Sequence, residues 1–103
     1  MRIIILGAGR VGFTVASNLA NENIDITIID QHQESIDKVC ERLDVSAICG
    51  NVTHPDVLVS ADIKHADIII AVTDSDDTNM MACQIAHHLF QVPQKIARVR
   101  AQS

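Results

Sequence analysis

The chain has 103 residues, which is enough for one domain with one core. Its 48% hydrophobic content excludes an intrinsically disordered protein, and its apolar runs, such as Ile68 to Val72, are too short for direct membrane insertion. A net charge of -5 and the absence of Trp and Tyr exclude a nucleic-acid-binding protein. Three cysteines without a CxxC pair, and no recognisable signal sequence, predict a cytoplasmic protein without disulfides.

Short runs of β-branched residues alternate with helical patterns along the whole chain. The runs are continuous rather than alternating, which is typical of strands buried on both faces of a parallel sheet. The strands are expected at residues 3–6, 24–29, 45–49, 66–72 and 95–100.

Between these strands, apolar residues recur at helical spacing. The first two helices are expected around residues 11–19 and 36–43. The third is expected to begin at Pro55, with Thr53 and Asp56 approximating a capping box. The fourth begins in the acidic run after the fourth strand, and its apolar face is expected to consist of Met81, Ile85 and Leu89.

Strands that alternate with helices predict an α/β domain built on a parallel sheet. Right-handed crossovers then give a doubly wound, Rossmann-like sheet with strand order 3-2-1-4-5. A complete doubly wound domain has a sixth strand, which this sequence lacks. We therefore expect residues 1–103 to form a single nucleotide-binding domain that is a piece of a longer protein.

Three of the four glycines lie close together, in the sequence Gly7-Ala8-Gly9-Arg10-Val11-Gly12. This is a G-x-G-x-x-G motif, and it follows a predicted strand and opens a predicted helix, as dinucleotide-binding motifs do. Gly7 permits the tight turn, Gly9 lets the backbone approach a pyrophosphate, and Gly12 lets the helix pack against the sheet. The pyrophosphate is then expected at the helix N-terminus.

Asp30 closes the second predicted strand and is the expected partner of the ribose. Its carboxylate can accept hydrogen bonds from both ribose hydroxyls, whereas a 2′-phosphate would meet its negative charge. The sequence therefore predicts NAD(H) rather than NADP(H).

Further candidate contacts follow the other strands, because ligands of doubly wound sheets bind at the carboxyl ends of the strands. Arg10 in the glycine turn is a candidate phosphate ligand, with a solvated surface charge as the less favoured alternative. Arg98, near the end of the fifth strand, is equally a candidate for a second phosphate contact and for a surface or partner salt bridge. The remaining candidates follow the third and fourth strands and are Asn51, Val52, Thr73 and Asp74.

Other chemistry is weakly supported by the sequence. The carboxylates of Asp74, Asp76 and Asp77 suit a helix N-terminus, with a divalent-cation site as the alternative. The five histidines are expected on the surface, so no metal site is predicted from them. No catalytic pair can be argued from spacing, so we expect no enzymatic activity.

Several segments together resemble the RCK nucleotide-binding family, which is also called KTN or TrkA-N. The similarity covers nearly the whole chain and is more specific than the glycine motif alone. The segments that carry it are Ile3-Ile4-Ile5-Leu6-Gly7-Ala8-Gly9, Asp25-Ile26-Thr27-Ile28-Ile29-Asp30, His54-Pro55-Asp56-Val57-Leu58, Ala71-Val72-Thr73, Thr78-Asn79-Met80 and Ile96-Ala97-Arg98-Val99-Arg100.

This resemblance implies a cytoplasmic regulatory protein, peripheral to the inner membrane, that couples nucleotide binding to the gating of a membrane potassium channel or transporter. It implies homo-oligomers, which are rings in the family, and it implies NAD(H), ATP or ADP as ligands. The family's nucleotide contacts correspond to Gly7 to Gly12, Asp30, Asn51-Val52, Thr73-Asp74 and Arg98. Arg10 departs from the Gln often found in these relatives, and Arg is known there in ATP-responsive ones, so NAD(H) and ATP/ADP both stay open.

Two alternatives from other classes also stay open. The chain has the motif of a dehydrogenase cofactor domain, but it has no room for a substrate domain. A methyltransferase-like domain would hold S-adenosylmethionine through an acidic residue such as Asp30, but the complete glycine motif favours a pyrophosphate. The fifth strand is a predicted sheet edge, so we also expect self-association, most simply as a two-fold dimer.

Overall fold

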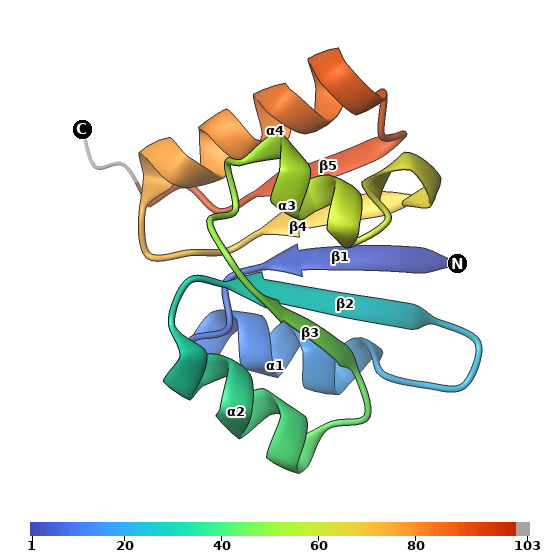
Figure 1. Cartoon of the computed structure of the whole chain (residues 1–103), viewed down its shortest axis with the longest axis vertical. Helices are drawn as coiled ribbons and strands as arrows, with labels where there is room; N and C mark the ends of the chain where they lie inside the picture. Colours follow the sequence, from blue (N-terminus) through green and yellow to red (C-terminus); the bar gives the residue numbers. More distant parts are fainter. Residues whose placement is uncertain (101–103) are drawn as a thin grey trace.

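A parallel sheet with the strand order β3-β2-β1-β4-β5 forms the middle layer of the computed structural model, which describes residues 1–100 (Figure 1). The predicted α/β class and strand order are confirmed. The strands are β1 (Arg2–Leu6), β2 (Asp25–Asp30), β3 (Ser46–Cys49), β4 (Ile68–Ala71) and β5 (Gln94–Ala97). The helices are α1 (Arg10–Leu19), α2 (Gln33–Arg42), α3 (Pro55–Ser60), the 3₁₀ helix η1 (Ile63–His65) and α4 (Asp76–Phe90).

The last two strands are shorter than predicted, for identifiable reasons. Ala66 is not in β4 because its backbone N–H caps η1 by donating to Ile63. β5 ends at Ala97 rather than Arg100, because β4, the strand beside it, ends at Ala71. Arg98 follows the strand and still donates its backbone N–H to the Ala71 carbonyl over 2.9 Å.

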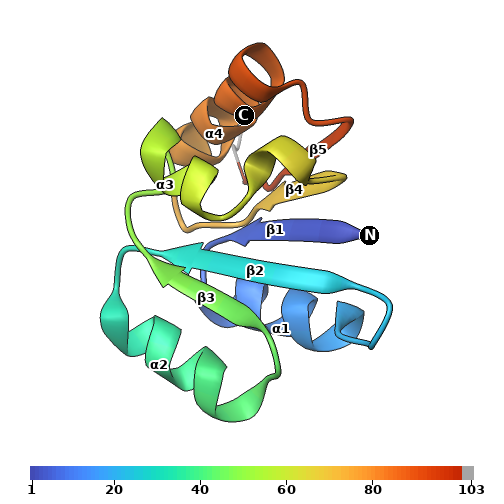
Figure 2. The ribbon, with the colours of Figure 1, turned by 45° about the vertical axis from the view of Figure 1, so that its right-hand side comes forward.

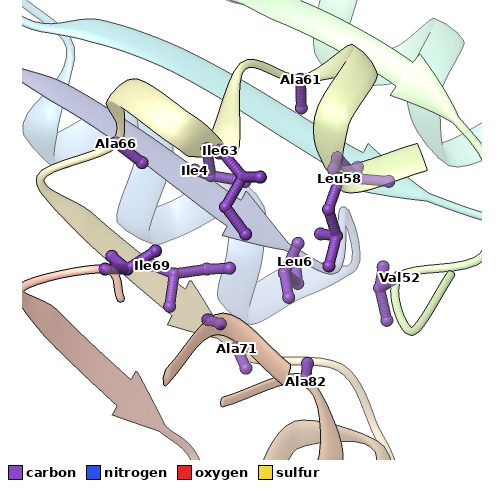
Figure 3. Close-up of a cluster of buried hydrophobic side chains, with 13 residues drawn as sticks. Ile4, Leu6, Val52, Leu58, Ala61, Ile63, Ala66, Ile69, Ala71 and Ala82 are labelled. Atoms are coloured by element: carbon purple, nitrogen blue, oxygen red, sulfur yellow. The ribbon is translucent and has the colours of Figure 1, made fainter. Parts of the chain in front are cut away.

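The helices cover both faces of the sheet, as in a doubly wound fold. Helices α1 and α2 lie on one face, and α3, η1 and α4 lie on the other (Figures 1 and 2). Alternate residues of β1 point to opposite faces of the sheet. Ile3 and Ile5 belong to the core under α1 and α2, and Ile4 and Leu6 belong to the core under α3, η1 and α4. Figure 3 shows this second core, in which Leu58 and Ile63 from the α3–η1 segment pack towards β1 and β4.

The buried face of α4 differs from the prediction. Met81 and Leu89, expected to face the core, are 55% and 58% exposed. The buried residues of α4 are Asn79, Ala82 and Ala86. Small side chains bring α4 close to the sheet, so Met81 and Leu89 turn outward, whereas Ile85, the third residue of the predicted face, is half-buried against the core.

The start of α3 is partly as predicted. Pro55 occupies its first turn as expected. The capping box is wrong, because the residue at the N-cap is His54, whose side chain makes no cap hydrogen bond. Thr53 instead donates its hydroxyl hydrogen bond to Asn51 Oδ1 over 2.7 Å. Within residues 1–100, none of the helices has the length and apolar character required to cross a membrane.

Candidate functional site

A cleft of about 530 Å³ lies at the carboxyl ends of the strands. Residues that follow all five strands line it, in the order that the sheet imposes: Asn51 after β3, Asp30 at the end of β2, Gly9 after β1, Thr73 after β4 and Arg98 after β5. Neighbouring strands are about 4.8 Å apart, so this row of residues is roughly 19 Å long. An elongated ligand can therefore contact every strand end at once.

Two glycines of the glycine motif, Gly7 in the turn after β1 and Gly12 in the first part of α1, are required by the fold. Gly7 has a φ of 111°, and a Cβ atom there would lie 2.9 Å from the Val72 carbonyl oxygen. A Cβ atom on Gly12 would lie 1.8 Å from the Gly7 carbonyl oxygen. Neither position accommodates a side chain, because the turn, β4 and α1 approach one another too closely.

Gly9 is different, because nothing in the described structure requires a glycine there. It is the N-cap residue of α1, with an ordinary φ of -77°, and no atom lies within 4 Å of a Cβ atom built on it. It has no side chain to cap the helix, and the first turn of α1 contains no acidic residue. The first N–H groups of α1 are therefore left for an outside acceptor at the positive end of the helix dipole.

Asp30 connects the glycine turn to the rim of the cleft. Its Oδ2 accepts the Ala8 N–H over 2.8 Å, and its Oδ1 accepts the His32 N–H over 2.8 Å. The His32 ring nitrogen Nδ1 lies 3.0 Å from the same Oδ1. The carboxylate is 14% exposed, so it faces the cleft with acceptor capacity remaining.

Two arginines give the cleft positive charge in an acidic chain. Arg10 is exposed at the start of α1, and Arg98 is partly exposed after β5. Within residues 1–100, neither guanidinium is in an ion pair. Both are therefore available to an anion.

The segment at the start of α4 is held by hydrogen bonds, and one of its three predicted carboxylates, that of Asp76, takes part in them. Ser75 caps the helix by accepting the Thr78 N–H. Asp76 Oδ2 accepts the Arg100 N–H over 2.9 Å, and the Arg100 side chain donates to the Asp74 carbonyl. In the part of the chain that the structure describes, no group of His, Cys, Asp or Glu residues is arranged to hold a metal ion. The cation site considered for this segment gains no support.

The structure brings most of the sequence-predicted site residues together. Those that line the cleft are Gly7, Gly9, Arg10, Val11, Asp30, Asn51, Val52, Thr73, Asp74 and Arg98. Ala8 and Gly12 do not line it: both are buried beneath the turn, where Ala8 bonds to Asp30 and Gly12 packs on Gly7. The packing role predicted for Gly12 fits this position, and the predicted contact of Ala8 and Gly12 with a cofactor stays a prediction.

Sequence reasoning missed several lining residues, which are Gln31, His32, Ser35, Thr53, Val72, Ser75 and Thr78. They are neighbours of predicted residues in the same loops, and no motif distinguishes them. It also missed the role of Asn79, which is buried behind the cleft wall and bonded to Thr73 and Arg98. Its signal was present: Asn79, Ala82 and Ala86 form a small-residue face at helical spacing.

Comparisons with known proteins agree with this geometry. The family model described as the TrkA-N domain matches residues 3–103. The chain is 48% identical over 103 residues to the Trk system potassium uptake protein TrkA of Azorhizobium caulinodans. The match covers 100% of this chain and 22% of that protein, so the chain spans about a fifth of its relative's length.

Two solved structures have the same fold. The TrkA-N domain of the inner membrane protein ybaL from Escherichia coli superposes with a TM-score of 0.81 at 22% identity, covering 94% of this chain and 71% of that chain. The Shewanella denitrificans Kef CTD in its AMP-bound form has a TM-score of 0.74 at 25% identity, covering 93% of this chain and 57% of that chain.

Proposed function

Because the chain belongs to the TrkA-N domain family, we propose that it is the nucleotide-binding regulatory domain of a potassium uptake system. In this proposal a nucleotide binds along the cleft, and its binding energy favours one conformation of the larger protein over another. A ligand can shift such an equilibrium only through different affinities for the two states. The domain thus reports nucleotide state to a membrane potassium channel or transporter.

The observation that carries nucleotide binding is the open space at Gly9. The fold does not require a glycine there, yet the position adjoins the uncapped N-terminus of α1 inside the cleft. A ligand that approaches the backbone closely explains the missing side chain. The N–H groups and dipole of the helix favour an anion, and a pyrophosphate is the anion that this arrangement suits.

The rest of the cleft supports an adenine nucleotide, and NAD(H) in particular. Asp30 can accept the ribose hydroxyls, and Asn51 and Val52 lie beyond it towards the β3 edge, where an adenine would sit. The row of strand ends suits a dinucleotide in length. The AMP-bound Kef relative supports the adenine half. ATP or ADP is the alternative ligand, because Arg10 can hold a terminal phosphate.

A regulatory rather than a catalytic role is supported by the relatives, which are named potassium uptake proteins. Their names also support a cytoplasmic position at the inner face of the membrane, next to the transport subunit. We propose that the domain works as a homo-oligomer, dimeric at least. Large apolar side chains of α4 and the β5 edge are exposed and support such an assembly.

Co-purification tests this proposal simply, because the chain has no Trp or Tyr and hardly absorbs at 280 nm. We expect an absorbance peak at 260 nm from bound nucleotide, which chromatography then identifies. After the nucleotide is removed, calorimetry should show that NADH binds and that NADPH binds much more weakly. A stripped chain that binds neither NADH nor an adenine nucleotide would refute the proposal.

A further inference from the structure

We propose that Asn79 is a positioning residue for the distal half of the nucleotide site, and that it thereby sets the preference for a dinucleotide over a mononucleotide. This inference rests on the proposed nucleotide binding and adds a selectivity determinant to it. Asn79 does not line the cleft, so it acts through the residues that it holds.

The Asn79 side chain is fully buried and uses its hydrogen-bonding capacity on the cleft wall. It has 0% exposure. Its Oδ1 accepts the Thr73 N–H over 2.9 Å and the Thr73 hydroxyl over 2.7 Å. Its Nδ2 donates to the Thr73 carbonyl over 3.1 Å and to the Arg98 carbonyl over 2.9 Å. A side-chain amide has two N–H donors and one oxygen that can accept two hydrogen bonds, so all of its hydrogen-bonding capacity is used.

These bonds join two strand ends that the β-ladder no longer connects. β4 and β5 end at Ala71 and Ala97, and beyond these ends Asn79 adds to the hydrogen bonds that the Arg98 and Arg100 segment already makes to the end of β4 and the chain after it. The backbone of Arg98 is held on both sides, by its N–H to the Ala71 carbonyl and by its carbonyl to Asn79. Because both peptide groups are fixed, the direction in which the Arg98 side chain leaves the backbone is fixed too.

The position of this junction determines which part of a ligand it affects. Across the cleft, Asn51 and Asp30 belong to the β3–β2 side, and Thr73 and Arg98 belong to the β4–β5 side. A mononucleotide that uses Asp30 for its ribose and the α1 N-terminus for its phosphate occupies the first side. A dinucleotide continues past the glycine turn over Thr73 towards Arg98. Asn79 therefore pre-organises the part of the site that only the longer ligand needs.

The test compares NADH and AMP on the 103-residue chain. We expect Asn79→Ala to raise the dissociation constant of NADH by about tenfold or more, since at least one hydrogen-bonded wall contact is lost. The dissociation constant of AMP should change by less than about threefold, because the shorter ligand does not extend over Thr73 and Arg98. Intrinsic NADH fluorescence gives the first constant, and calorimetry gives the second. Asn79→Ser provides a milder variant that retains a polar group.

A matched control separates positioning from loss of stability. Ile63→Val removes a buried methyl group in η1, at the amino ends of the strands and away from the cleft, and Ile63 is 1% exposed. Circular dichroism in urea measures the stability of each variant, and Ile63→Val should leave both dissociation constants unchanged.

If the Asn79 variants raise the dissociation constants of NADH and AMP by the same factor, the inference is overturned. A failure of both Asn79 variants to fold would also overturn it, because the contacts would then serve the fold itself. If the unchanged chain binds neither ligand, the proposed function fails instead.

Discussion

A Gly9→Ala substitution is expected to weaken nucleotide binding while leaving the stability of the domain nearly unchanged. A Cβ atom at this position has no neighbour within 4 Å, and the φ of -77° suits alanine. The added methyl group therefore occupies the space that the pyrophosphate needs, without disturbing the protein. Gly12→Ala is the matched contrast, because its Cβ atom would lie 1.8 Å from the Gly7 carbonyl oxygen.

The expected magnitudes follow from the contacts. Losing one hydrogen bond to a charged phosphate costs about 1.5–3 kcal/mol, so the NADH dissociation constant should rise roughly 10- to 150-fold in Gly9→Ala. Alanine restricts the unfolded chain, which stabilises the folded domain by about 0.4–1 kcal/mol. Alanine is also a poorer N-cap residue than glycine, which costs up to about 1 kcal/mol, so the two effects nearly cancel. In Gly12→Ala the backbone must move, and we expect a stability loss of about 1–3 kcal/mol.

NADH fluorescence titration and urea unfolding followed by circular dichroism measure the two effects separately. We expect Gly9→Ala to unfold at the same urea concentration as the wild type and to bind NADH more weakly. A Gly9→Ala chain that binds NADH as tightly as the wild type would refute the placement of the pyrophosphate at α1. A Gly9→Ala chain that is strongly destabilised would show that the glycine serves the fold.

Three further predictions concern the carboxylate, the thiols and the assembly. Asp30→Asn should weaken NADH binding about tenfold and reduce the preference for NADH over NADPH. Asparagine is a milder change than alanine, because Asp30 also accepts the Ala8 N–H. Calorimetry that shows an unchanged ratio of the two affinities would contradict the ribose role. Burial raises the pKa of the Cys83 thiol above its ordinary value, so a smaller fraction of Cys83 is thiolate at pH 8 than in a free cysteine. Iodoacetamide should therefore modify the exposed Cys40 and Cys49 before Cys83. Mass spectrometry that shows Cys83 reacting equally fast would count against this. Light scattering should show self-association as concentration rises, whereas a mass of 11.2 kDa at every concentration would refute the dimer.

The parts of this domain that were predictable are those set by local backbone demands. A continuous β-branched run followed by three clustered glycines specifies a buried strand, a tight turn and a close helix, and the structure has all three. Asp30 was identifiable because the end of β2 must lie beside the end of β1 in a doubly wound sheet. Parallel topology then placed the loops after the other strands around the same cleft.

The parts that were not predictable depend on how closely elements approach. Met81 and Leu89 were assigned to the core of α4 because they are large and apolar, but the helix packs through Ala82 and Ala86. Asn79 lies on a small-residue face with Ala82 and Ala86, but the sequence does not show what its side chain bonds to, because the Arg98 carbonyl is 19 residues away along the chain. The second role of Asp30, holding the Ala8 N–H, likewise requires the folded turn.

The most direct test of the account is an amide chemical-shift map of the chain during titration with NADH. We expect the largest shift changes at residues that line the cleft at the carboxyl ends of the five strands. The residues expected to shift most are Gly9, Asp30, Asn51, Thr73 and Arg98. Saturable changes at these positions would support a nucleotide lying along the cleft, whereas changes confined to the amino ends of the strands, or no changes at all, would contradict it.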